Sequence, residues 1–538
     1  MSWTPPTSLD TPLPPFELEP MDRVFSVVVE RWAAHDPNRE CLVQDDGSAL
    51  TYGELDRAAS TIAAGLRELG IGVGDRVATL LENDLRVVQV GIALSKLGAV
   101  EVPVNPALVG ASMRHVLADA DPTASVVAPR FRDALVASLP DGGAPVLVSA
   151  GPLDGSAEPG PSPSVEEMLA GPPVELRTSA EVRASSPTAI MYTSGTTGLP
   201  KGALLPHHHC FRIAQRTAGA LALTTEDTLI SILPLFHAGG RYMNVGACLL
   251  SGARCGFVRR FSGAAYFDQA RTFGATVMHA VVSVGHFLLA QEPSAADRDH
   301  TITRGLLAPR PTAVGDAFTE RFGFEVFEAY ASTESNISVF NLDGRKGACG
   351  RAYPPYRVRI VDEHDRELPA GETGEIVVDC DEPWSTFAGY WNQPATSLEV
   401  LRNFGLHTGD AGYLDADGFL HYVDRIKDMI RRRGENVAAQ TVEDVVNMID
   451  GVAESAAYPV PSEFGEEEIA VAVMARAGHA PTSEQIVAVC REKLPRFAVP
   501  RYVRFVDDLP RTETGKIQKF RLKQAGTTGA HDHPEVRP

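Results

Sequence analysis

The chain has 538 residues, more than one hydrophobic core supports, so its length predicts several domains. Hydrophobic residues make up 44% and charged residues 22%, as in a soluble globular protein, and a formal net charge of -20 argues against general binding to nucleic acid or anionic membranes. Seven cysteines without a C-x-x-C pair indicate reduced thiols, and the start of the chain lacks the features of a signal peptide. We therefore expect a cytoplasmic protein that does not enter a membrane.

Strand and helix patterns alternate through the first hundred residues. Thr51 is followed three positions later by Glu54, the spacing of a capping box, and apolar residues then recur on one helical face until Gly70. Strands are predicted at 77–81 and 100–104, and the helix between them ends before Gly98. This alternation predicts a parallel sheet covered by helices on both faces.

The pattern changes in the second half of the chain. Residues 374–378 open a β-rich section with many turn signals, which ends near the charged run 424–428. The residues beyond it predict a compact α+β module, and residues 527–538 are predicted to be a frayed tail. The module's predicted helices are 442–449 and 483–494, and its predicted strands are 453–460, 469–475 and 502–506.

The stretch with the clearest chemistry is 190–202, which reads I-M-Y-T-S-G-T-T-G-L-P-K-G. Its start predicts a buried strand, and the glycines after it let backbone N–H groups close around an anion. A polar surface turn is the simpler interpretation, but the density of hydroxyls and the lysine favour a triphosphate-binding loop. The loop differs from a P-loop, because Pro200 precedes Lys201 and Gly202 follows it. The predicted phosphate-binding residues are Thr193, Ser194, Gly195, Thr196, Thr197, Gly198 and Lys201.

The run Y-T-S-G-T-T-G-L-P-K-G resembles the signature of the adenylate-forming superfamily of acyl-CoA synthetases, luciferases and peptide-synthetase adenylation domains. The run A-Y-A-S-T-E at 329–334 resembles the family's Y-G-x-T-E motif. The resemblance implies that Thr333 contacts a phosphate, that Glu334 helps to hold Mg²⁺, and that Tyr330 stacks beside the adenine. A carboxylate suits Mg²⁺ because it is a hard oxygen ligand. Ala331 replaces the usual glycine, and its methyl group is expected to narrow the acyl pocket.

Other motifs of the family follow in order. G-Y-W-N at 389–392 and H-T-G-D at 407–410 match two further signatures. The resemblance implies that Asp410 accepts hydrogen bonds from the ribose hydroxyls and that Arg425 approaches the ribose. It also implies nucleotide binding by Tyr422. The residues that stand beside the adenine, where the family has G-A-P, are Ala308, Pro309 and Arg310.

The run P-L-F-H-A-G-G at 234–240 places His237 at the family's aromatic position that gates the carboxylate site. Amino-acid adenylation domains carry an aspartate near this motif, and its absence here favours an acid without an amine. Small residues at 238–240 and Ala331 favour a bulky aryl, medium-chain, polycyclic or terpenoid acid. The three histidines at 207–209 are assigned no metal, because consecutive helical residues cannot all face one ion; His207 instead matches a family position.

The run P-R-T-E-T-G-K-I at 510–517 resembles the family's C-terminal catalytic-lysine motif. The resemblance implies that Lys516 bridges the substrate carboxylate and the α-phosphate. It also implies a domain at 1–425 that binds ATP and the acid, and a mobile domain at 426–538 that turns about a hinge at Lys427. That rotation brings the CoA-side loop of Gly434, Glu435 and Asn436 to the site. Residues 437–443 depart from the family pattern, with Thr441 in place of the first glutamate of its E-V-E run.

Taken together, these features predict an α/β protein: a large N-terminal domain of doubly wound sheets with a β-rich subdomain, plus a small mobile α+β C-terminal domain. The predicted activity is that of an AMP-forming acyl-CoA synthetase similar to the crotonobetaine, medium-chain and aryl-CoA ligase branch, acting on a small carboxylic acid with ATP, Mg²⁺ and CoA. One alternative passes the acyl group to a carrier protein or a separate thiolating enzyme. Others are a non-enzymatic binding protein and a luciferase-type oxygenase, and relatives suggest a homodimer. The predicted catalytic residues are Thr193, His237, Glu334 and Lys516.

Overall fold

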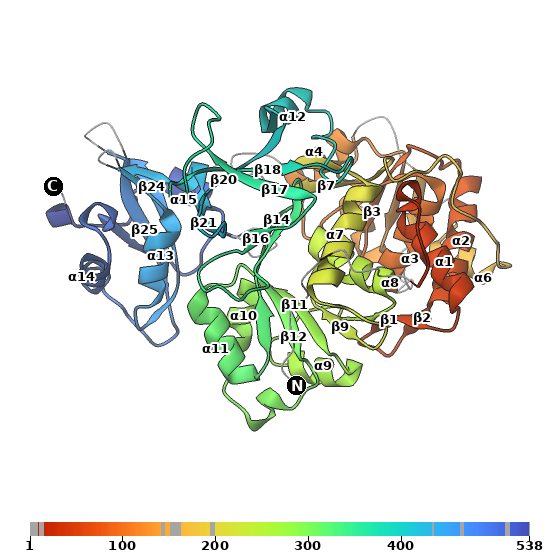
Figure 1. The fold of residues 1–538 in the computed structure, drawn as a ribbon, viewed down its shortest axis with the longest axis horizontal. Coiled ribbons are helices and arrows are strands. Elements are labelled where there is room, and N and C mark those ends of the chain that lie inside the picture. The colour runs from red at the N-terminus through yellow and green to blue at the C-terminus, as the bar shows by residue number, and fades with distance from the viewer. Residues whose placement is uncertain are drawn as a thin grey trace. The chain divides into compact units, whose positions relative to one another are not determined.

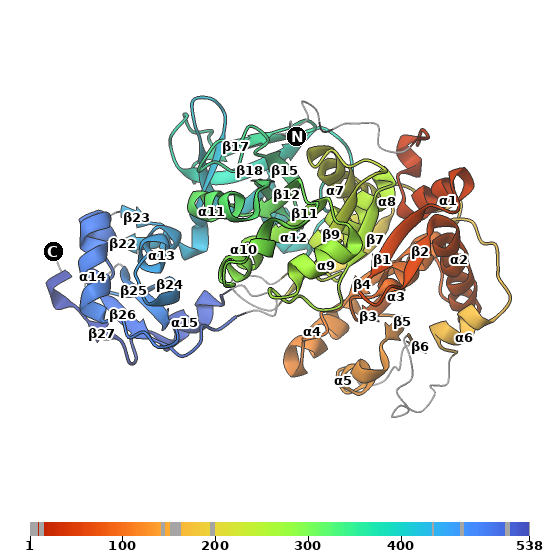
Figure 2. The same ribbon diagram turned by 90° about the horizontal axis from the view of Figure 1, so that it is seen from below.

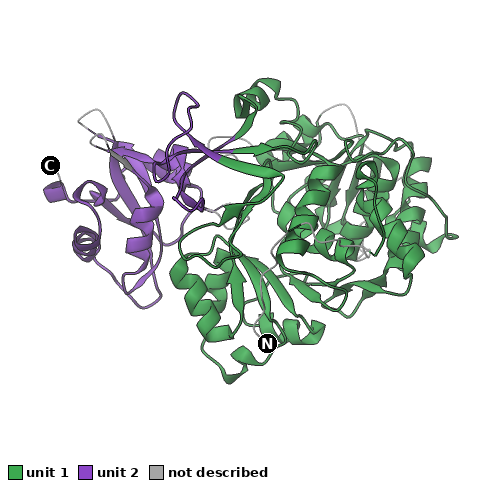
Figure 3. Cartoon of the chain, viewed as in Figure 1, with its two compact units in different colours: residues 1–193, 199–358, 378–406 green, residues 194–198, 359–377, 407–538 purple. Residues whose placement is uncertain are grey.

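The computed structural model describes residues 9, 15–140, 146–150, 163–193, 200–432, 435–462, 467–511 and 517–536, with the backbone alone at 435–436. The described residues form two compact units (Figure 3). Those of unit 1 lie within 9–193, 200–358 and 378–406, and those of unit 2 within 359–377 and 407–536. The predicted functional boundary between residues 425 and 426 stays a prediction, because compactness alone does not locate a hinge. Among the described helices, none is both long and apolar enough to cross a membrane.

The first sheet of unit 1, whose strands β3 and β7 are labelled in Figure 1, has the strand order β6-β5-β3-β4-β7-β8. Its neighbouring strands are parallel except for β7 and β8, which form a hairpin. The parallel order confirms the predicted fold class, since parallel neighbours require crossover connections. The strands are β3 (Arg76–Leu80), β4 (Val100–Pro103), β5 (Ala124–Val127), β6 (Val146–Ser149), β7 (Pro187–Thr193) and β8 (Lys201–Pro206).

Local signals set the helix ends beside this sheet. Thr51 and Glu54 form the predicted capping box at the start of α2 (Tyr52–Glu68). Gly98, with a φ of 75°, ends α3 (Leu85–Leu97) in the left-handed region that a side chain disfavours. The other helices here are α1 (Phe25–His35), α4 (Gly110–Ala120), α5 (Arg132–Val136) and α6 (Val165–Ala170), with the 3-10 turns η1 (Pro20–Asp22) and η2 (Pro129–Phe131).

The second sheet of unit 1 has the order β13-β12-β11-β9-β10-β1-β2 and is parallel apart from β1 with β2. Strand β1 from the start of the chain thus pairs with β10 from its middle. The strands are β1 (Glu40–Gln44), β2 (Ala49–Thr51), β9 (Thr228–Ser231), β10 (Arg254–Phe257), β11 (Val277–Val281), β12 (Arg304–Ala308) and β13 (Glu325–Phe327). The helices are α7 (His207–Ala220), the π-helix η3 (Gly239–Gly246), α8 (Ala247–Ser251), α9 (Tyr266–Phe273), α10 (Val282–Leu289), the 3-10 turn η4 (Ala295–Arg298) and α11 (Thr312–Phe322).

Short antiparallel strands follow, as the β-rich section predicted. Strands β14 (Ala329–Ser332), β15 (Asn336–Phe340) and β16 (Arg351–Ala352) form one small sheet in that order. A further sheet has the order β17-β18-β20-β19, with β21 paired to β20. Its strands are β17 (Tyr356–Val361), β18 (Gly374–Cys380), β19 (Leu401–Arg402), β20 (Gly405–Leu414) and β21 (Leu420–Arg425), and helix α12 (Pro394–Val400) precedes β19.

The end of the chain forms the predicted α+β module (Figure 2). In β25, Ile469, Val471 and Val473 pack in one core with α13 and α14, while Ala470 and Ala472 pack in another with α15. The period of two shows that helices cover both faces of the sheet. Its strands are β24 (Val452–Pro461), β25 (Glu467–Ala475), β26 (Tyr502–Phe505) and β27 (His531–Asp532), and its helices are α13 (Ala439–Asn447), α14 (Ser483–Lys493) and α15 (Lys519–Ala525). Before α13 lie the 3-10 turn η5 (Ile426–Asp428) and the hairpin of β22 (Ile430–Arg432) and β23 (Glu435–Val437), and η6 (Arg496–Ala498) and η7 (Pro534–Val536) complete the elements.

The predicted frayed tail is wrong for its described part, 527–536. Strand β27 pairs with β26, and the Asp532 carboxylate accepts from the Arg501 guanidinium at 2.8 and 3.1 Å. Val536 is buried in the core of the module. The sequence did not indicate this order, because a strand of two residues leaves no periodic pattern.

Candidate active site

Thr193 and Lys201 close the β7–β8 hairpin, where they pair directly across the two strands. Ile190 and Met191 are buried in β7, which confirms the predicted buried strand. The hairpin therefore presents the hydroxyl of Thr193 and the ammonium group of Lys201 at the base of the predicted phosphate loop. The loop residues Ser194, Gly195, Thr196, Thr197 and Gly198 lie outside the described residues, so their phosphate contacts stay predictions.

Glu334 lies in the turn between β14 and β15, and two hydroxyls meet its carboxylate. The Thr193 hydroxyl donates to Glu334 Oε1 at 3.3 Å, and the Tyr390 hydroxyl donates to the same oxygen at 2.9 Å. The fold thus brings together three motifs that are far apart in the sequence. Among the described residues, here included, no group of three His, Cys, Asp or Glu side chains is arranged to hold a metal. A lone carboxylate among hydroxyls fits Mg²⁺, which keeps several waters and binds through substrate phosphates.

The segment that carries Tyr390 runs beside β8. Ala388 N–H donates to Leu204 O at 2.8 Å, and Trp391 N–H donates to Gly202 O at 2.7 Å. These bonds bring the Tyr390 ring under Lys201, whose Nζ lies 5.2 Å from the ring centroid. In the sequence, Tyr390 stands out only as part of the G-Y-W-N motif, and nothing there assigns it a role. That motif was the signal available, but the contact with Glu334 depends on the fold.

The remaining residues of the A-Y-A-S-T-E motif lie on β14 or in the turn after it. Tyr330 is buried, Ala331 is exposed, and Thr333 is partly buried beside Glu334. A register shift in the β14–β15 pair falls between Tyr330 and Ala331, at the position where the family's glycine is replaced. The stacking of Tyr330 on adenine and the phosphate contact of Thr333 stay predictions.

Ala308 is the last residue of β12, and Pro309 and Arg310 follow it at the carboxyl end of the strand, where open parallel sheets bind ligands. Burial raises the pKa of the nearby Glu328 carboxyl to about 7, although the backbone N–H and the charge of Arg310 both act to lower it. The Arg310 guanidinium also lies 3.4 Å from Asp316 Oδ1. Two carboxylates from later in the chain, Asp316 and Glu328, therefore hold the segment that is predicted to contact adenine.

His237 lies just before the π-helix η3, with its ring centroid 4.4 Å from that of Phe236. A Cβ on Gly240 would lie 2.4 Å from Pro234 O, so this glycine is required by the close approach of the backbone. The absence of a side chain at Gly240 is consequently no evidence that the acyl pocket has room for a bulky acid. Arg241 of η3 anchors the segment through a buried bidentate ion pair with Glu101, at 2.9 and 3.0 Å.

In unit 2, Asp410 and Arg425 are direct partners across the β20–β21 pair. Arg425 Nε lies 2.8 Å from Asp410 Oδ1, and the aspartate is buried. Tyr422 lies opposite Gly412 in the same pair of strands. The structure thus makes neighbours of the residues predicted to bind the ribose, and their contact with it stays a prediction.

Four predicted residues of the C-terminal part remain untested. Lys516 and Gly434 lie outside the described residues, and the side chains of Glu435 and Asn436 do as well. Lys427, the predicted hinge, lies in η5, where its carbonyl accepts from Lys523 Nζ at 2.8 Å.

Comparison with known proteins places this chain among enzymes that bind AMP. The AMP-binding enzyme family matches residues 29–391, and the AMP-binding enzyme C-terminal domain matches residues 441–516. A sulfoacetate–CoA ligase of Cupriavidus necator is 30% identical over 516 residues, covering 94% of this chain and 98% of that protein. A crotonobetaine/carnitine–CoA ligase of Escherichia coli is 29% identical over 483 residues, covering 88% and 93%. The crystal structure of ATP-bound MatB from Rhodopseudomonas palustris matches with a TM-score of 0.84 and 29% identity, covering 93% of this chain and 98% of that one.

Proposed function

The chain belongs to the AMP-binding enzyme family, and we propose that it activates a carboxylic acid with ATP and then transfers the acyl group to CoA. The predicted enzyme class, an acid–thiol ligase of the AMP-forming type, is confirmed by the family and by the named CoA ligases among its relatives. The predicted α/β architecture is confirmed as well. The acid and the roles of individual residues are our proposal.

The proposed reaction has two steps. In the first, a carboxylate oxygen attacks the α-phosphorus of ATP, the bond to the bridging oxygen breaks, and pyrophosphate leaves. In the second, the thiol of CoA attacks the acyl carbon of the adenylate, loses its proton and releases AMP. Phosphoryl and adenylyl transfers of this kind need positioning and charge stabilisation more than covalent help from the protein.

The contact of Glu334 with Thr193 and Tyr390 carries the proposal. The Glu334 carboxylate accepts hydrogen bonds from two hydroxyls at the base of a Gly/Ser/Thr-rich loop that is predicted to bind the triphosphate. Its hard oxygen atoms are thus placed to bind the Mg²⁺ that accompanies the phosphates. Bound Mg²⁺ would neutralise phosphate charge, and Glu334 would hold it. Lys201 would add a positive charge to the same place. The family resemblance assigns Lys516 to the α-phosphate and His237 to the acid carboxylate.

Asp410 is the proposed ribose-binding residue. Its neighbour Arg425 orients the carboxylate through the ion pair at 2.8 Å. An ionised aspartate accepts hydrogen bonds from two adjacent hydroxyls, which is the pattern that a ribose presents.

The acid is proposed to lack an α-amino group, since residues 234–240 carry no aspartate that would pair an amine. Gly239 favours a bulky aryl, medium-chain or polycyclic acid over a small one. The final acceptor is proposed to be CoA, and a carrier protein is the alternative. We also propose a cytoplasmic location and a homodimer.

The test is exchange of labelled pyrophosphate into ATP across a panel of aliphatic, aryl and terpenoid acids, followed by mass spectrometry of the CoA esters. Acid-dependent exchange and a CoA ester are expected for at least one acid. Glu334→Gln should reduce exchange about 100-fold, whereas Glu325→Gln, at an exposed residue of the edge strand β13, should leave it unchanged. Background exchange with every acid would reject the proposal, and exchange without a CoA ester would favour the carrier-protein alternative.

A further inference from the structure

His209 of α7 is buried, and both of its ring nitrogens meet backbone carbonyls. Nε2 lies 3.0 Å from Thr333 O, and Nδ1 lies 2.9 Å from Ser385 O. Thr333 precedes Glu334 in the β14–β15 turn, so the ring contacts the backbone that carries the proposed magnesium ligand. In the sequence, His209 is only one of three consecutive histidines, and nothing there assigns it a role.

The neighbours of His209 determine which nitrogen carries the proton. Burial lowers the pKa of His209 to about 4, so the ring is neutral at pH 7 and has a single N–H. Ser385 O already accepts from the Tyr356 hydroxyl at 2.7 Å, so the second hydrogen of the Asn336 amide, whose first goes to His209 O, is available to another acceptor. The Asn336 amide nitrogen is also 3.4 Å from His209 Nδ1. These partners favour Nδ1 as an acceptor and leave the Nε2–H to donate to Thr333 O.

Asn336 holds the other end of the same turn. It is buried with a φ of 70°, a left-handed conformation that asparagine tolerates better than most residues. Its side-chain amide donates to His209 O at 2.9 Å, and its Oδ1 accepts from Ile337 N–H at 2.7 Å. The residues on either side of the turn that carries Glu334, namely Thr333 and Asn336, thus both form hydrogen bonds with His209 of α7.

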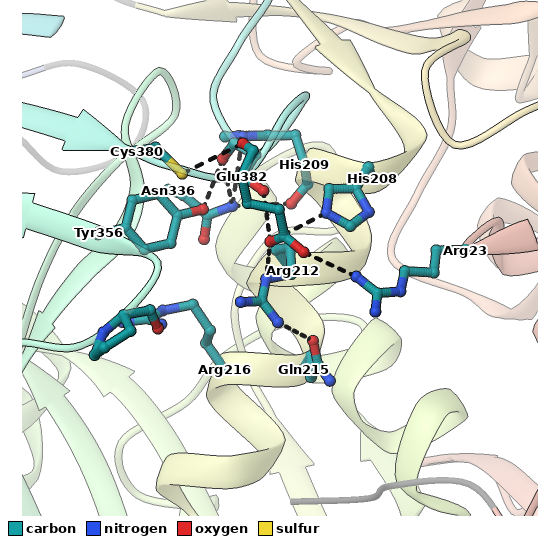
Figure 4. Close-up of polar contacts among 12 residues, drawn as sticks. Arg23, His208, His209, Arg212, Gln215, Arg216, Asn336, Tyr356, Cys380 and Glu382 are labelled. Atoms are coloured by element: carbon teal, nitrogen blue, oxygen red, sulfur yellow. Dashed lines mark hydrogen bonds and ion pairs between the residues drawn. The ribbon is translucent and has the colours of Figure 1, made fainter. Parts of the chain in front are cut away.

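Residues 382–387, which include the Ser385 carbonyl that meets His209 Nδ1, are held by a cluster of ion pairs around Glu382 (Figure 4). Glu382 lies 2.8 Å from Arg212 Nε, 3.0 Å from Arg23 Nη1 and 3.2 Å from His208 Nε2. Burial alone would raise the pKa of Glu382, but the hydrogen bond from His208 and the charge of Arg212 lower it to about 2. The Ser385 hydroxyl also donates to Glu382, at 2.9 Å.

The segment anchored in this way reaches Glu334 directly. Two residues beyond Ser385, the Phe387 N–H donates to Glu334 O at 3.0 Å. The backbone on both sides of the Glu334 side chain is therefore bound, by His209 at Thr333 O and by Phe387 at Glu334 O. Since α7 contributes His209 and also His208 and Arg212, two of the partners of Glu382, one helix supports both of these contacts.

We propose that His209 is a positioning residue, which holds the Thr333–Glu334 backbone through its Nε2–H so that the Glu334 carboxylate stays aligned with Thr193 and Tyr390 to bind magnesium–ATP. This inference rests on the proposed function, because it assigns a purpose to that alignment. His209 is not catalytic itself, since it contacts the backbone that carries the metal ligand and none of the reacting atoms.

The test compares two substitutions of similar size. His209→Leu removes the N–H, whereas the amide of His209→Gln reaches the Nε2 position and can still donate to Thr333 O. Binding of a fluorescent N-methylanthraniloyl derivative of ATP is titrated with Mg²⁺ for each full-length variant. We expect the Mg²⁺ concentration for half-maximal nucleotide binding to rise at least about 10-fold in His209→Leu, as when other residues that support a metal ligand are changed. In His209→Gln, this concentration should stay within about 3-fold of the wild-type value. The KM for the acid should change less than about 3-fold in both.

Melting temperatures and one control separate this effect from general damage. The control is His364→Leu, at an exposed histidine, which should bind magnesium–ATP as wild type does. If His209→Leu does not fold, Asn336→Gly takes its place: glycine keeps the left-handed backbone but loses the amide that makes Nδ1 an acceptor. This variant is expected to need about 3- to 10-fold more Mg²⁺.

Each outcome decides between the inference and the proposed function. Wild-type Mg²⁺ dependence in His209→Leu, or an equal loss in His209→Gln, would overturn the positioning role while pyrophosphate exchange still supports the enzyme. The opposite result is that no acid supports pyrophosphate exchange, whereas His209→Leu weakens Mg²⁺-dependent nucleotide binding and His209→Gln does not. The positioning role of His209 then stands, and the proposed reaction is rejected. Absence of Mg²⁺-dependent nucleotide binding in the wild type would overturn both.

Discussion

The Thr193 hydroxyl and the Glu334 carboxylate lie 3.3 Å apart although 141 positions separate them in the chain. Tyr390 donates to the same carboxylate oxygen from a third segment. One hydroxyl belongs to the base of the predicted phosphate loop and the other to a segment that pairs with β8. A magnesium-binding carboxylate is consequently built against the loop where the phosphates are expected.

Tyr390→Phe tests the hydroxyl separately from the ring. The variant keeps the aromatic face near Lys201 but leaves Glu334 without one donor, and a hydrogen bond to a charged group contributes about 1.5–3 kcal/mol. We expect pyrophosphate exchange at limiting Mg²⁺ to fall at least about 10-fold. Tyr390→Leu, which also removes the ring, should fall further. Equal exchange by Tyr390→Phe and the wild type would contradict a role for the hydroxyl.

Lys516→Ala tests the two-step scheme. Removal of a donor that meets charge developing at the α-phosphate is expected to reduce adenylation about 100- to 1000-fold. The attack of CoA on a supplied acyl-adenylate should be nearly unaffected, because the lysine acts in the first step only. Single-turnover assays of each half-reaction measure the difference, with Lys493→Ala, at an exposed lysine of α14, as the control. Equal loss in both steps would contradict the alternation of two conformations.

The Asp410–Arg425 pair predicts coupled effects on nucleotide binding. Asp410→Asn should raise the KM for ATP at least about 10-fold, because an amide is a weaker acceptor and loses the charge that Arg425 meets. The double variant Asp410→Asn/Arg425→Leu should lose less than the sum of the two single changes, since contacting residues are not independent. The KM for the acid should stay constant, and Asp417→Asn in an exposed turn is the control. Additive losses would show that the pair does not act together.

Glu328 predicts a pH-dependent stability. Burial raises its pKa from 4.5 to about 7 in the folded protein, so between these values the folded state binds more protons than the unfolded state. The contribution of Glu328 to stability therefore decreases as the pH rises through this window, by about 1–3 kcal/mol. Glu328→Gln should match the wild type near pH 4.5 and melt at a higher temperature at pH 8. Melting curves that differ by a constant amount between these pH values would contradict the assignment.

The sequence by itself determined the local elements and the family of this protein. Thr51 with Glu54 marked the start of α2, Gly98 marked the end of α3, and the Y-T-S-G-T-T-G-L-P-K-G run identified an adenylate-forming enzyme. These signals are local, because caps and loop glycines act within one turn of chain. Residue identities at short spacing therefore carried both the fold class and the reaction class.

Only the tertiary structure decided which residues meet. In the fold, Tyr390 contacts Glu334, and His209 contacts the backbone beside that residue. The close approach of Pro234 O explains why residue 240 is a glycine. Strand β27 pairs with β26, where the sequence predicted a frayed tail. None of these follows from periodicity, because each depends on backbone segments that meet only in the folded chain. The sequence thus identified the parts of the active site, and the packing of α7 and β8 against later segments determined how those parts are held.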